Sequence, residues 1–293
     1  MNGLRAAAGL GLRRALTAPG RWLPVALPLA LAVALFTALS AAAVVAGDHA
    51  ARDTLSALGP ARGGVAVTWA YGAGPRTDRE ARDALAAMGA GTVTRGITLV
   101  STDFGRAVIR LGAIAPIAPA VRVLSGRLPR GPCLPARCEV LHVSGPAPAG
   151  ELVADRGINV HVVGRGLVTA QPAIGYTTSP ADFAPGKVDA RAPVLLAADP
   201  AGVDGLAPLD SLSRTQNWSA PLPLADLHAW DLDEQVARIA RVDAGLQRTF
   251  DGFTTTSPRV ALEAARARSD RAPARLAAAG ATAAAALAAF LLL

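Results

Sequence analysis

Two uncharged apolar runs near the ends of the chain constrain its fold more than any other feature. The first covers residues 22–47 and the second covers residues 276–293. A bilayer core about 30 Å thick needs about 20 helical residues, so each run has roughly the length of a membrane-spanning helix. Pro24 and Pro28 lie near the start of the first run, where proline is tolerated best. The pattern predicts a membrane protein with two transmembrane helices.

The distribution of charge supports this prediction. All 22 acidic residues lie between Asp48 and Asp270. Six of the 29 basic residues lie outside that stretch and flank the apolar runs: Arg5, Arg13, Arg14, Arg21, Arg271 and Arg275. A net charge of +7 would suit nucleic acid if it were clustered on a folded face, whereas flanking arginines suit an anionic membrane surface. We expect the lipid bilayer as a partner and no nucleic acid.

The residues before the first run predict the orientation of the chain. Residues 1–21 place apolar residues at helical spacing among arginines, which is typical of a cytoplasmic amphipathic leader. A cleavable signal is the alternative, but its apolar region is usually about 7 to 15 residues long. We expect an uncleaved transmembrane helix at 22–47, an extracytoplasmic domain at 48–270 and a second transmembrane helix at 271–293. The arginines before the second helix oppose this orientation, but the first helix usually decides it.

The predicted location is therefore the cell membrane, as a multi-pass protein with a cytoplasmic N-terminus. Because the sequence stops inside the second apolar run, we expect it to be a truncated part of a longer protein. A tail-anchored domain that ends at Leu293 is the alternative.

The stretch 48–270 mixes strand and helix patterns. Short β-branched runs predict strands at 64–70, 93–100, 107–114, 138–143, 158–163, 167–174, 193–198 and 253–256. Helices are predicted at 79–88, over about 18 to 20 residues from Leu232, and from Ser257 toward the second apolar run, where Pro273 is expected to kink or break the helix. Proline, glycine and serine accumulate at 200–223, which predicts a linker or surface loop. The predicted fold class is α+β, with a mixed α+β extracytoplasmic domain of two lobes.

Cys133 and Cys138 are the only cysteines and lie in the sequence GPCLPARC. Outside the cytoplasm such a pair usually oxidises, so we predict a disulfide. A metal site is the alternative, but two thiols do not complete tetrahedral zinc, and only His142 lies nearby. We expect no metal-binding and no cofactor-binding residues.

The sequence contains no pattern typical of catalysis. It lacks a Gly-x-Ser-x-Gly elbow, and its four histidines are scattered singly. The only lysine, Lys187, does not lie in a phosphate-binding loop, so the chain cannot hydrolyse ATP by that route. Asp231, Asp233 and Glu234 are explained by the start of a helix, where acidic residues are favoured. We expect no catalytic residues and no enzyme activity.

The layout resembles the N-terminal part of FtsX/MacB-type ABC transporter permeases, in particular the branch found in high-GC bacteria. Three stretches carry the resemblance: 12–16 (LRRAL), the arginine–cysteine segment 124–140 (LSGRLPRGPCLPARCEV), and 261–266 (ALEAAR). The arginine–cysteine segment is the most specific of them. The resemblance extends over the whole chain but covers only the first part of such permeases, which have at least four spans.

The resemblance implies a fold similar to the periplasmic core of MacB and a role in mechanotransmission. A separate cytoplasmic ATPase subunit would move the spanning helices, and the external domain would change shape in response. The permease would work as a homodimer or with a second permease half. A membrane-anchored extracytoplasmic binding or adhesion protein without a transport role is the alternative. A secreted hydrolase would require cleavage near Gly47 and a catalytic group that the sequence does not supply.

Overall fold

The computed structural model describes the backbone of residues 19–58, 62–99, 102–104, 107–145, 152–153, 157–168, 193–210, 212, 214–249 and 252–292. The chain divides into two compact units. The helical unit comprises Met1–Ala51 with Ala267–Leu293, and the α/β unit comprises Arg52–Arg266. Residues 1–18, most of the predicted leader, lie outside the described residues.

Long helices begin and end the described chain, and strands and short helices lie between them. In chain order the elements are α2 (Pro19–Ser56), β1 (Gly64–Trp69), α4 (Pro75–Ala87), β2 (Thr94–Leu99), β3 (Thr102–Phe104), β4 (Ala107–Ala115), η1 (Ala118–Ala120), β5 (Val121–Gly126), β6 (Cys138–Ser144), β7 (Leu152–Val153), β8 (Asn159–Val168), β9 (Val194–Ala197), α5 (Pro200–Asp204), η3 (Ala207–Leu209), β10 (Arg214–Pro221), η4 (Leu224–Asp226), η5 (Ala229–Asp231), α6 (Leu232–Thr249), β11 (Phe253–Thr256) and α7 (Arg259–Leu292).

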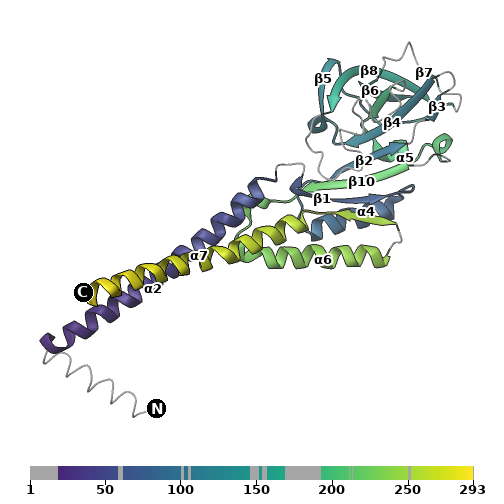
Figure 1. The fold of residues 1–293 in the computed structure, drawn as a ribbon. Helices are drawn as coiled ribbons and strands as arrows, with labels where there is room; N and C mark the ends of the chain where they lie inside the picture. Colours follow the sequence, from purple (N-terminus) through teal and green to yellow (C-terminus); the bar gives the residue numbers. More distant parts are fainter. Residues whose placement is uncertain are drawn as a thin grey trace. The chain divides into compact units, whose positions relative to one another are not determined.

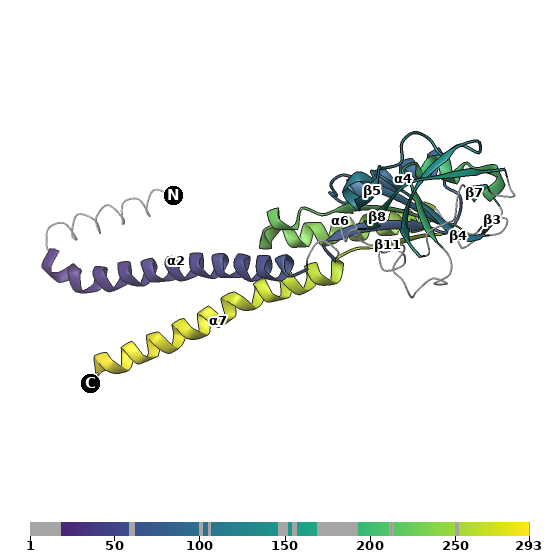
Figure 2. The ribbon, with the colours of Figure 1, turned by 90° about the horizontal axis from the view of Figure 1, so that it is seen from above.

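The described part of the helical unit consists of α2 up to Ala51 and α7 from Ala267, and Figure 2 shows α2 and α7 as long continuous helices. They approach closely at Gly47, where an added Cβ would lie 3.0 Å from Ser269 Oγ. Pro273 lies inside α7 and does not break it, so of the two predicted outcomes, a kink or a break, only the kink stays a prediction. Within the part of the chain that the structure describes, none of the helices combines the length and apolarity needed to cross a membrane. The spans at 22–47 and 271–293 stay predictions, and most of their side chains lie outside the described residues.

The strands of the α/β unit form one continuous sheet (Figure 1). The strand order is β11-β1-β10-β2-β4-β9-β6-β8-β5, with β3 added to β4 and β7 added to β8. We call β11, β1, β10 and β2 the first part of the sheet, and β4, β9, β6, β8 and β5 the second part. Neighbours are antiparallel except for the parallel pairs β4–β9 and β6–β8. The predicted lobes are therefore not separated by a break in the sheet.

Helices α4 and α6 pack beside each other against the first part of the sheet (Figure 1). In α4 the buried residues are Ala81, Ala84 and Leu85, which recur at helical spacing. In α6 the spacing of Leu232, Ile239 and Leu246 likewise places them on one buried side. The helix predicted from Leu232 is confirmed over 18 residues.

Two apolar clusters pack against the two faces of the second part of the sheet, and one of them extends to Ile97 and Leu99 of β2. Leu195 belongs to one cluster and its neighbour Leu196 to the other, as expected for successive residues of a strand. Val203 of α5 joins the cluster of Leu195. A strand buried on both faces reads as a continuous apolar run, which explains why 193–198 was recognisable in the sequence. The mixed α+β class is confirmed for the α/β unit.

The prediction of a linker at 200–223 is wrong. This stretch holds α5, η3 and the whole of β10, a strand between β1 and β2. Pro200 occupies the first turn of α5 behind the N-cap residue Asp199, and Pro221 ends β10. The prolines therefore mark the ends of elements. Trp218, which is fully buried in β10, shows that this stretch is part of the core.

Two element boundaries and one further strand also differ from the sequence predictions. The strands predicted at 158–163 and 167–174 form the single strand β8, and residues 169–174 lie outside the described residues. Glycines interrupt the β-branched pattern there, but they remain in the strand because backbone and side chains pack where a Cβ would stand. Helix α4 begins one turn earlier than predicted, at Pro75, with Gly74 as its N-cap. Strand β5 was not predicted.

Candidate functional site

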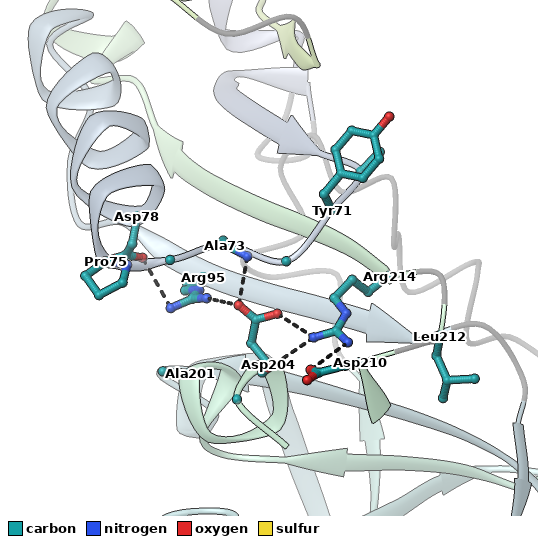
Figure 3. A pocket seen from close by; sticks show the side chains of 14 residues that line it. Tyr71, Ala73, Pro75, Asp78, Arg95, Ala201, Asp204, Asp210, Leu212 and Arg214 are labelled. Carbon is teal, nitrogen blue, oxygen red and sulfur yellow. Dashed lines mark hydrogen bonds and ion pairs between the residues drawn. The ribbon is translucent and has the colours of Figure 1, made fainter. Parts of the chain in front are cut away.

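A pocket of about 860 Å³ lies between α4 and α5 (Figure 3). The loop between β1 and α4, together with the first turn of α4, forms one wall. Helix α5 and the residues that follow it form the other wall. The pocket lies entirely within the α/β unit and is the candidate functional site.

The register of β2 and β10 places charged side chains under this pocket. The antiparallel pairing puts Arg95 opposite Trp218 and Leu99 opposite Arg214. Because side chains alternate between the two faces of a strand, Arg95, Gln216 and Arg214 share one face. Arg95 and Arg214 are each only 7% exposed. Buried arginines are stable only when their charges and donors are matched, so their partners define the site.

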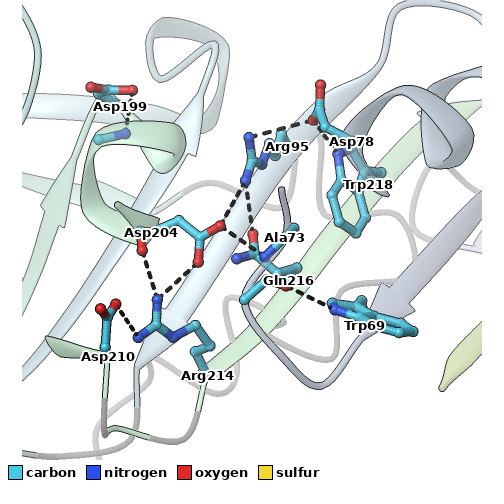
Figure 4. A network of polar contacts seen from close by, with 12 residues as sticks. Trp69, Ala73, Asp78, Arg95, Asp199, Asp204, Asp210, Arg214, Gln216 and Trp218 are labelled. Carbon is cyan, nitrogen blue, oxygen red and sulfur yellow. Dashed lines mark hydrogen bonds and ion pairs between the residues drawn. The ribbon is translucent and has the colours of Figure 1, made fainter. Parts of the chain in front are cut away.

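Asp204, the last residue of α5, connects both walls of the pocket to its floor (Figure 4). Its carboxylate accepts a hydrogen bond from the backbone N–H of Ala73 at 2.9 Å. The same carboxylate pairs with Arg95 at 3.4 Å and with Arg214 at 3.0 Å. One carboxylate thus ties the β1–α4 loop, β2 and β10 to α5.

Arg214 is held by the end of α5 and by the residues at the end of η3. Its Nη1 donates to the backbone oxygen of Asp204 at 2.7 Å, in addition to the ion pair with the carboxylate of that residue. Its Nη2 donates to the backbone oxygen of Leu209 at 2.6 Å and lies 3.5 Å from the carboxylate of Asp210. Because Nη1 is bound to Asp204 and Nη2 to Leu209, the planar guanidinium is held at both of its terminal nitrogens. It therefore forms a rigid part of the pocket floor.

Asp78, in the first turn of α4, completes the network on the other side. It accepts hydrogen bonds from Trp218 Nε1 at 2.7 Å and Arg82 Nε at 2.9 Å, and it lies 3.4 Å from Arg95. Burial alone would raise the pKa of Asp78, but the bonds from Arg82 and Trp218 and the charge of Arg95 lower it below its ordinary value. Burial lowers the pKa of Arg95, whose guanidinium also lies 5.6 Å from the centre of the Trp218 ring.

Tyr71 supplies the exposed aromatic ring of the pocket wall. Its side chain is 62% exposed, and its ring meets that of Trp69 edge to face at 5.4 Å. Trp69 in turn packs on Phe253 at 4.8 Å and donates through Nε1 to the backbone oxygen of Gly72 at 3.2 Å. The ring of Tyr71 is thus supported from one side and open to solvent.

The arginine–cysteine segment folds around a second charged residue, Glu139. Arg127 contacts its carboxylate with two nitrogens, at 2.6 and 2.8 Å, and Arg137 contacts it at 2.7 Å. The backbone N–H of Arg130 donates to it at 3.0 Å. The hydrogen bonds from Arg127, aided by Arg130 and Arg137, outweigh the effect of burial and lower the pKa of Glu139 to about 2.

The structure joins Cys133 and Cys138 as a disulfide, with their Cα atoms 4.3 Å apart. The loop that it closes contacts α5, since the N–H of Cys133 donates to Asp199 at 3.2 Å. Asp199 also caps α5 through the N–H of Gly202 at 2.9 Å. The five residues of α5 thus run from the disulfide loop at one end to Asp204 in the pocket at the other.

His142, the one histidine weighed as a metal ligand, does not belong to a metal site among the residues that the structure describes. Among the described residues, no group of three or more His, Cys, Asp or Glu side chains could hold a metal ion. His142 is buried in β6, whereas the disulfide already joins both cysteine sulfurs. His228 stacks on Trp230 at 4.3 Å and lies 2.7 Å from an Arg52 nitrogen.

The acidic residues near 231 serve the helix that follows them. The carboxylate of Asp231 accepts a hydrogen bond from the N–H of His228, so it belongs to the capping box at the start of η5 (Ala229–Asp231), directly before α6. Asp233 lies in the first turn of α6 and pairs with Arg266 at 2.6 Å. Glu234 pairs with Arg238 at 2.7 Å. Lys187 lies outside the described residues.

The sequence patterns did not identify Tyr71, Arg95, Asp204 or Arg214. Asp204 and Arg214 lie in the stretch that was predicted to be a linker. The residues of 214–219 (RTQNWS) are polar except for Trp218, so they lack the apolar–polar alternation that indicates a strand.

The first and last strands of the α/β unit, β1 and β11, are neighbours, and the start of β1 lies beside the end of β11. β1 starts opposite Pro221 of β10, and β11 ends with Thr256 opposite Ala66 of β1. Helix α2 precedes β1 across residues 57–63, and α7 follows β11 across residues 257 and 258. The strands that receive the two long helices are therefore direct hydrogen-bonded neighbours at one edge of the sheet.

No family model matches the chain, and no curated protein matches it. Among solved structures it is similar to the crystal structure of the periplasmic region of MacB from Actinobacillus actinomycetemcomitans. That likeness has a TM-score of 0.37 and 10% sequence identity, and it covers 71% of this chain and 95% of the other. A likeness at this level does not place the chain in a family.

Proposed function

We propose that the chain is a permease subunit of an ABC transporter, corresponding to the first part of a longer permease. In this proposal residues 48–270 lie outside the cytoplasm, and the apolar runs cross the cell membrane. A separate cytoplasmic ATPase subunit supplies the energy, and a second copy or another permease half completes the transporter. The chain transmits movement and performs no catalysis of its own.

The attachment of the two long helices to neighbouring strands carries this proposal. Four residue pairs join β1 and β11, from Trp69 with Phe253 to Ala66 with Thr256. A displacement of α7 relative to α2 acts first on this pair of strands. Because a hydrogen-bonded ladder resists sliding, the displacement is passed into the sheet and to the helices packed on it.

The close approach within the helical unit supports the same role. A side chain larger than glycine at position 47 would press on Ser269, whose Oγ and backbone oxygen lie 3.0 and 3.2 Å from the Cβ position. Small residues let helix backbones approach closely, as they do at helix contacts inside membranes. The contact between Gly47 and Ser269 therefore offers a fixed point about which α2 and α7 can turn.

A covalent link at this contact tests the proposal. The chain carrying G47C and S269C is purified from its native membranes with its associated ATPase and placed in lipid nanodiscs. Oxidation joins the helices, because the two positions are within reach of a disulfide. We expect ATP hydrolysis by the complex to fall about tenfold, by analogy with coupling energies of 1 to 3 kcal/mol, and to recover with reductant.

The matched control is the cysteine pair V45C and S269C. It moves the first cysteine from position 47 to position 45, because the Val45 side chain is 54% exposed. This pair should leave ATP hydrolysis unchanged under the same treatment, which also exposes Cys133 and Cys138 to the reductant. Purification without any ATPase, or equal activity with and without the link, would contradict the permease proposal.

The pocket favours the second candidate, a membrane-anchored extracytoplasmic binding protein. A concave site with an exposed aromatic ring and a rigid polar floor is typical of ligand recognition. This candidate predicts that the chain binds its ligand equally well with and without an ATPase subunit.

A further inference from the structure

Every charged side chain that lines the pocket is already paired with another charged side chain. The lining holds three aspartates and two arginines, and Arg82, which lies outside the lining, also pairs with Asp78. The pairs lie at 2.9 to 3.5 Å: Asp78 with Arg82 and Arg95, Asp204 with Arg95 and Arg214, and Asp210 with Arg214. A charged ligand would have to compete with these contacts. Breaking a buried pair leaves an uncompensated charge, which is strongly unfavourable. The network therefore favours a ligand without net charge.

The pocket nevertheless offers hydrogen-bonding groups at its surface. The side chain of Asp210 is 69% exposed, and its contact with Arg214 is long, at 3.5 Å. Its carboxylate oxygens are available as acceptors. The phenol of Tyr71 both donates and accepts. A hydroxyl group can likewise donate and accept, so it suits these groups without disturbing the ion pairs.

The ring of Tyr71 adds an apolar surface at the edge of the pocket, and Figure 3 shows it projecting away from Asp210 and Arg214, so a ligand that contacts both Tyr71 and Asp210 has to span the pocket. Tyr71 is 62% exposed, and its edge-to-face contact with Trp69 orients it. An ordered, exposed aromatic ring can bury a flat apolar surface at little cost in side-chain entropy. A pyranose ring has such a surface, because its axial C–H groups form one face while its hydroxyls project around the rim.

We propose that this pocket binds a neutral saccharide, stacked on Tyr71 and hydrogen-bonded to Asp210. The volume of about 860 Å³ is in the range of pockets that hold ligands of drug size, so it accommodates a short stretch of sugar units. The site lies wholly inside the α/β unit. The inference therefore does not depend on the permease proposal, and either one can fail without the other.

Saturation-transfer NMR on the full chain in lipid nanodiscs tests the inference, with glycosidic detergents avoided throughout. The probes are tri-N-acetylchitotriose, maltotriose and cellotriose. We expect at least one of them to bind, with the strongest transfer to the C–H protons of one pyranose face. Y71A should weaken binding about tenfold, because it removes the stacking surface.

W230A is the matched control, because Trp230 is also 62% exposed but lies outside the pocket lining. This variant should bind the probe as the unmodified chain does. D210A should weaken binding about threefold or more, because it removes the acceptor oxygens that the sugar hydroxyls contact. D210N keeps one acceptor oxygen and should therefore weaken binding less than D210A does.

Three results would overturn the proposal. The first is the absence of binding by all three saccharides at about 10 mM, a concentration at which even weak complexes form. The second is binding that Y71A leaves unchanged. The third is tighter binding of spermidine or citrate than of any saccharide, when that binding is lost in Y71A. If spermidine is the tighter ligand, D210N should weaken its binding about tenfold or more. Thermal unfolding of each variant verifies that it is folded.

Discussion

Glu139 illustrates how a single buried carboxylate organises its surroundings. Its side chain is 7% exposed, whereas those of Arg127 and Arg137 are 42% and 69% exposed. The hydrogen bonds from Arg127 are the main reason why the pKa of Glu139 falls from 4.5 to about 2. A carboxylate with a lowered pKa stabilises the folded state above its unfolded pKa, and this contribution is lost as the pH falls through the folded pKa. The relevant window therefore extends from pH 4.5 down to about 2.

We expect E139Q to be less stable than the unmodified chain at neutral pH and to approach it in stability near pH 2, because glutamine does not titrate. Urea unfolding at a series of pH values between about 7 and 2 measures the difference. E263Q is the control, since Glu263 is 47% exposed and pairs with Arg259 in one turn of α7. If the free energy of unfolding fell equally in E139Q and in the unmodified chain as the pH was lowered, this role of Glu139 would be contradicted.

Strands β5 and β8 approach unusually closely at Gly126 and Gly164, where an added Cβ would meet backbone atoms. Gly126 has a φ of +74°, and a Cβ there would lie 2.6 Å from Gly164 Cα. A Cβ on Gly164 would lie 2.8 Å from the backbone oxygen of Arg127. Each glycine thus makes room for the backbone of the opposite strand. Because β5 leads directly into Arg127, this approach also positions the partner of Glu139.

Gly131 allows the steric effect to be measured separately from the backbone effect. Its φ is +76°, but nothing lies within 4 Å of its Cβ position. We expect G131A to cost about 1 kcal/mol of unfolding free energy, which is the cost of placing alanine in the left-handed region. G126A should cost about 3 kcal/mol or more, because backbone atoms must also move. Chemical denaturation measures both, and equal costs would mean that β5 can shift away from β8.

At the scale of the whole molecule, the α/β unit is united by its sheet. β4 pairs with β2 on one side and with β9 on the other, so it connects the two parts of the sheet. The side chain of Leu111 in β4 is fully buried in the cluster that also contains Ile97 of β2 and Leu195 of β9. Elements that share a sheet and a core are expected to unfold together.

We expect L111A to destabilise both parts of the sheet equally, by about 2 to 5 kcal/mol. Hydrogen exchange of the full chain in increasing urea measures this, with peptides from β10 reporting on the first part and peptides from β6 on the second. L134A is the control, because Leu134 is 54% exposed and its truncation should change neither set. Loss of protection in only one set would show that the unit consists of two independently stable lobes.

The elements that could be predicted from the sequence are those whose pattern is local. Helix α6 follows from the spacing of Leu232, Ile239 and Leu246, and the start of α7 follows from Ser257 and Pro258. Strands β1, β2, β4, β6 and β9 follow from short β-branched runs. The pairing of Cys133 with Cys138 involves residues only five positions apart. In each case the decisive interactions lie within a few residues along the chain.

The strand β10 and the pocket could be found only in the tertiary structure. β10 is rich in polar residues, and it becomes a central strand because β1 and β2 hydrogen-bond to both of its edges. Asp204 meets Arg95 across 109 positions of sequence and the N–H of Ala73 across 131. A single sequence contains no signal for such contacts, because the strand register and the placement of α5 create them. The apolar runs, the charge asymmetry and the α+β class were thus properties of the sequence itself, whereas the buried network came from long-range packing.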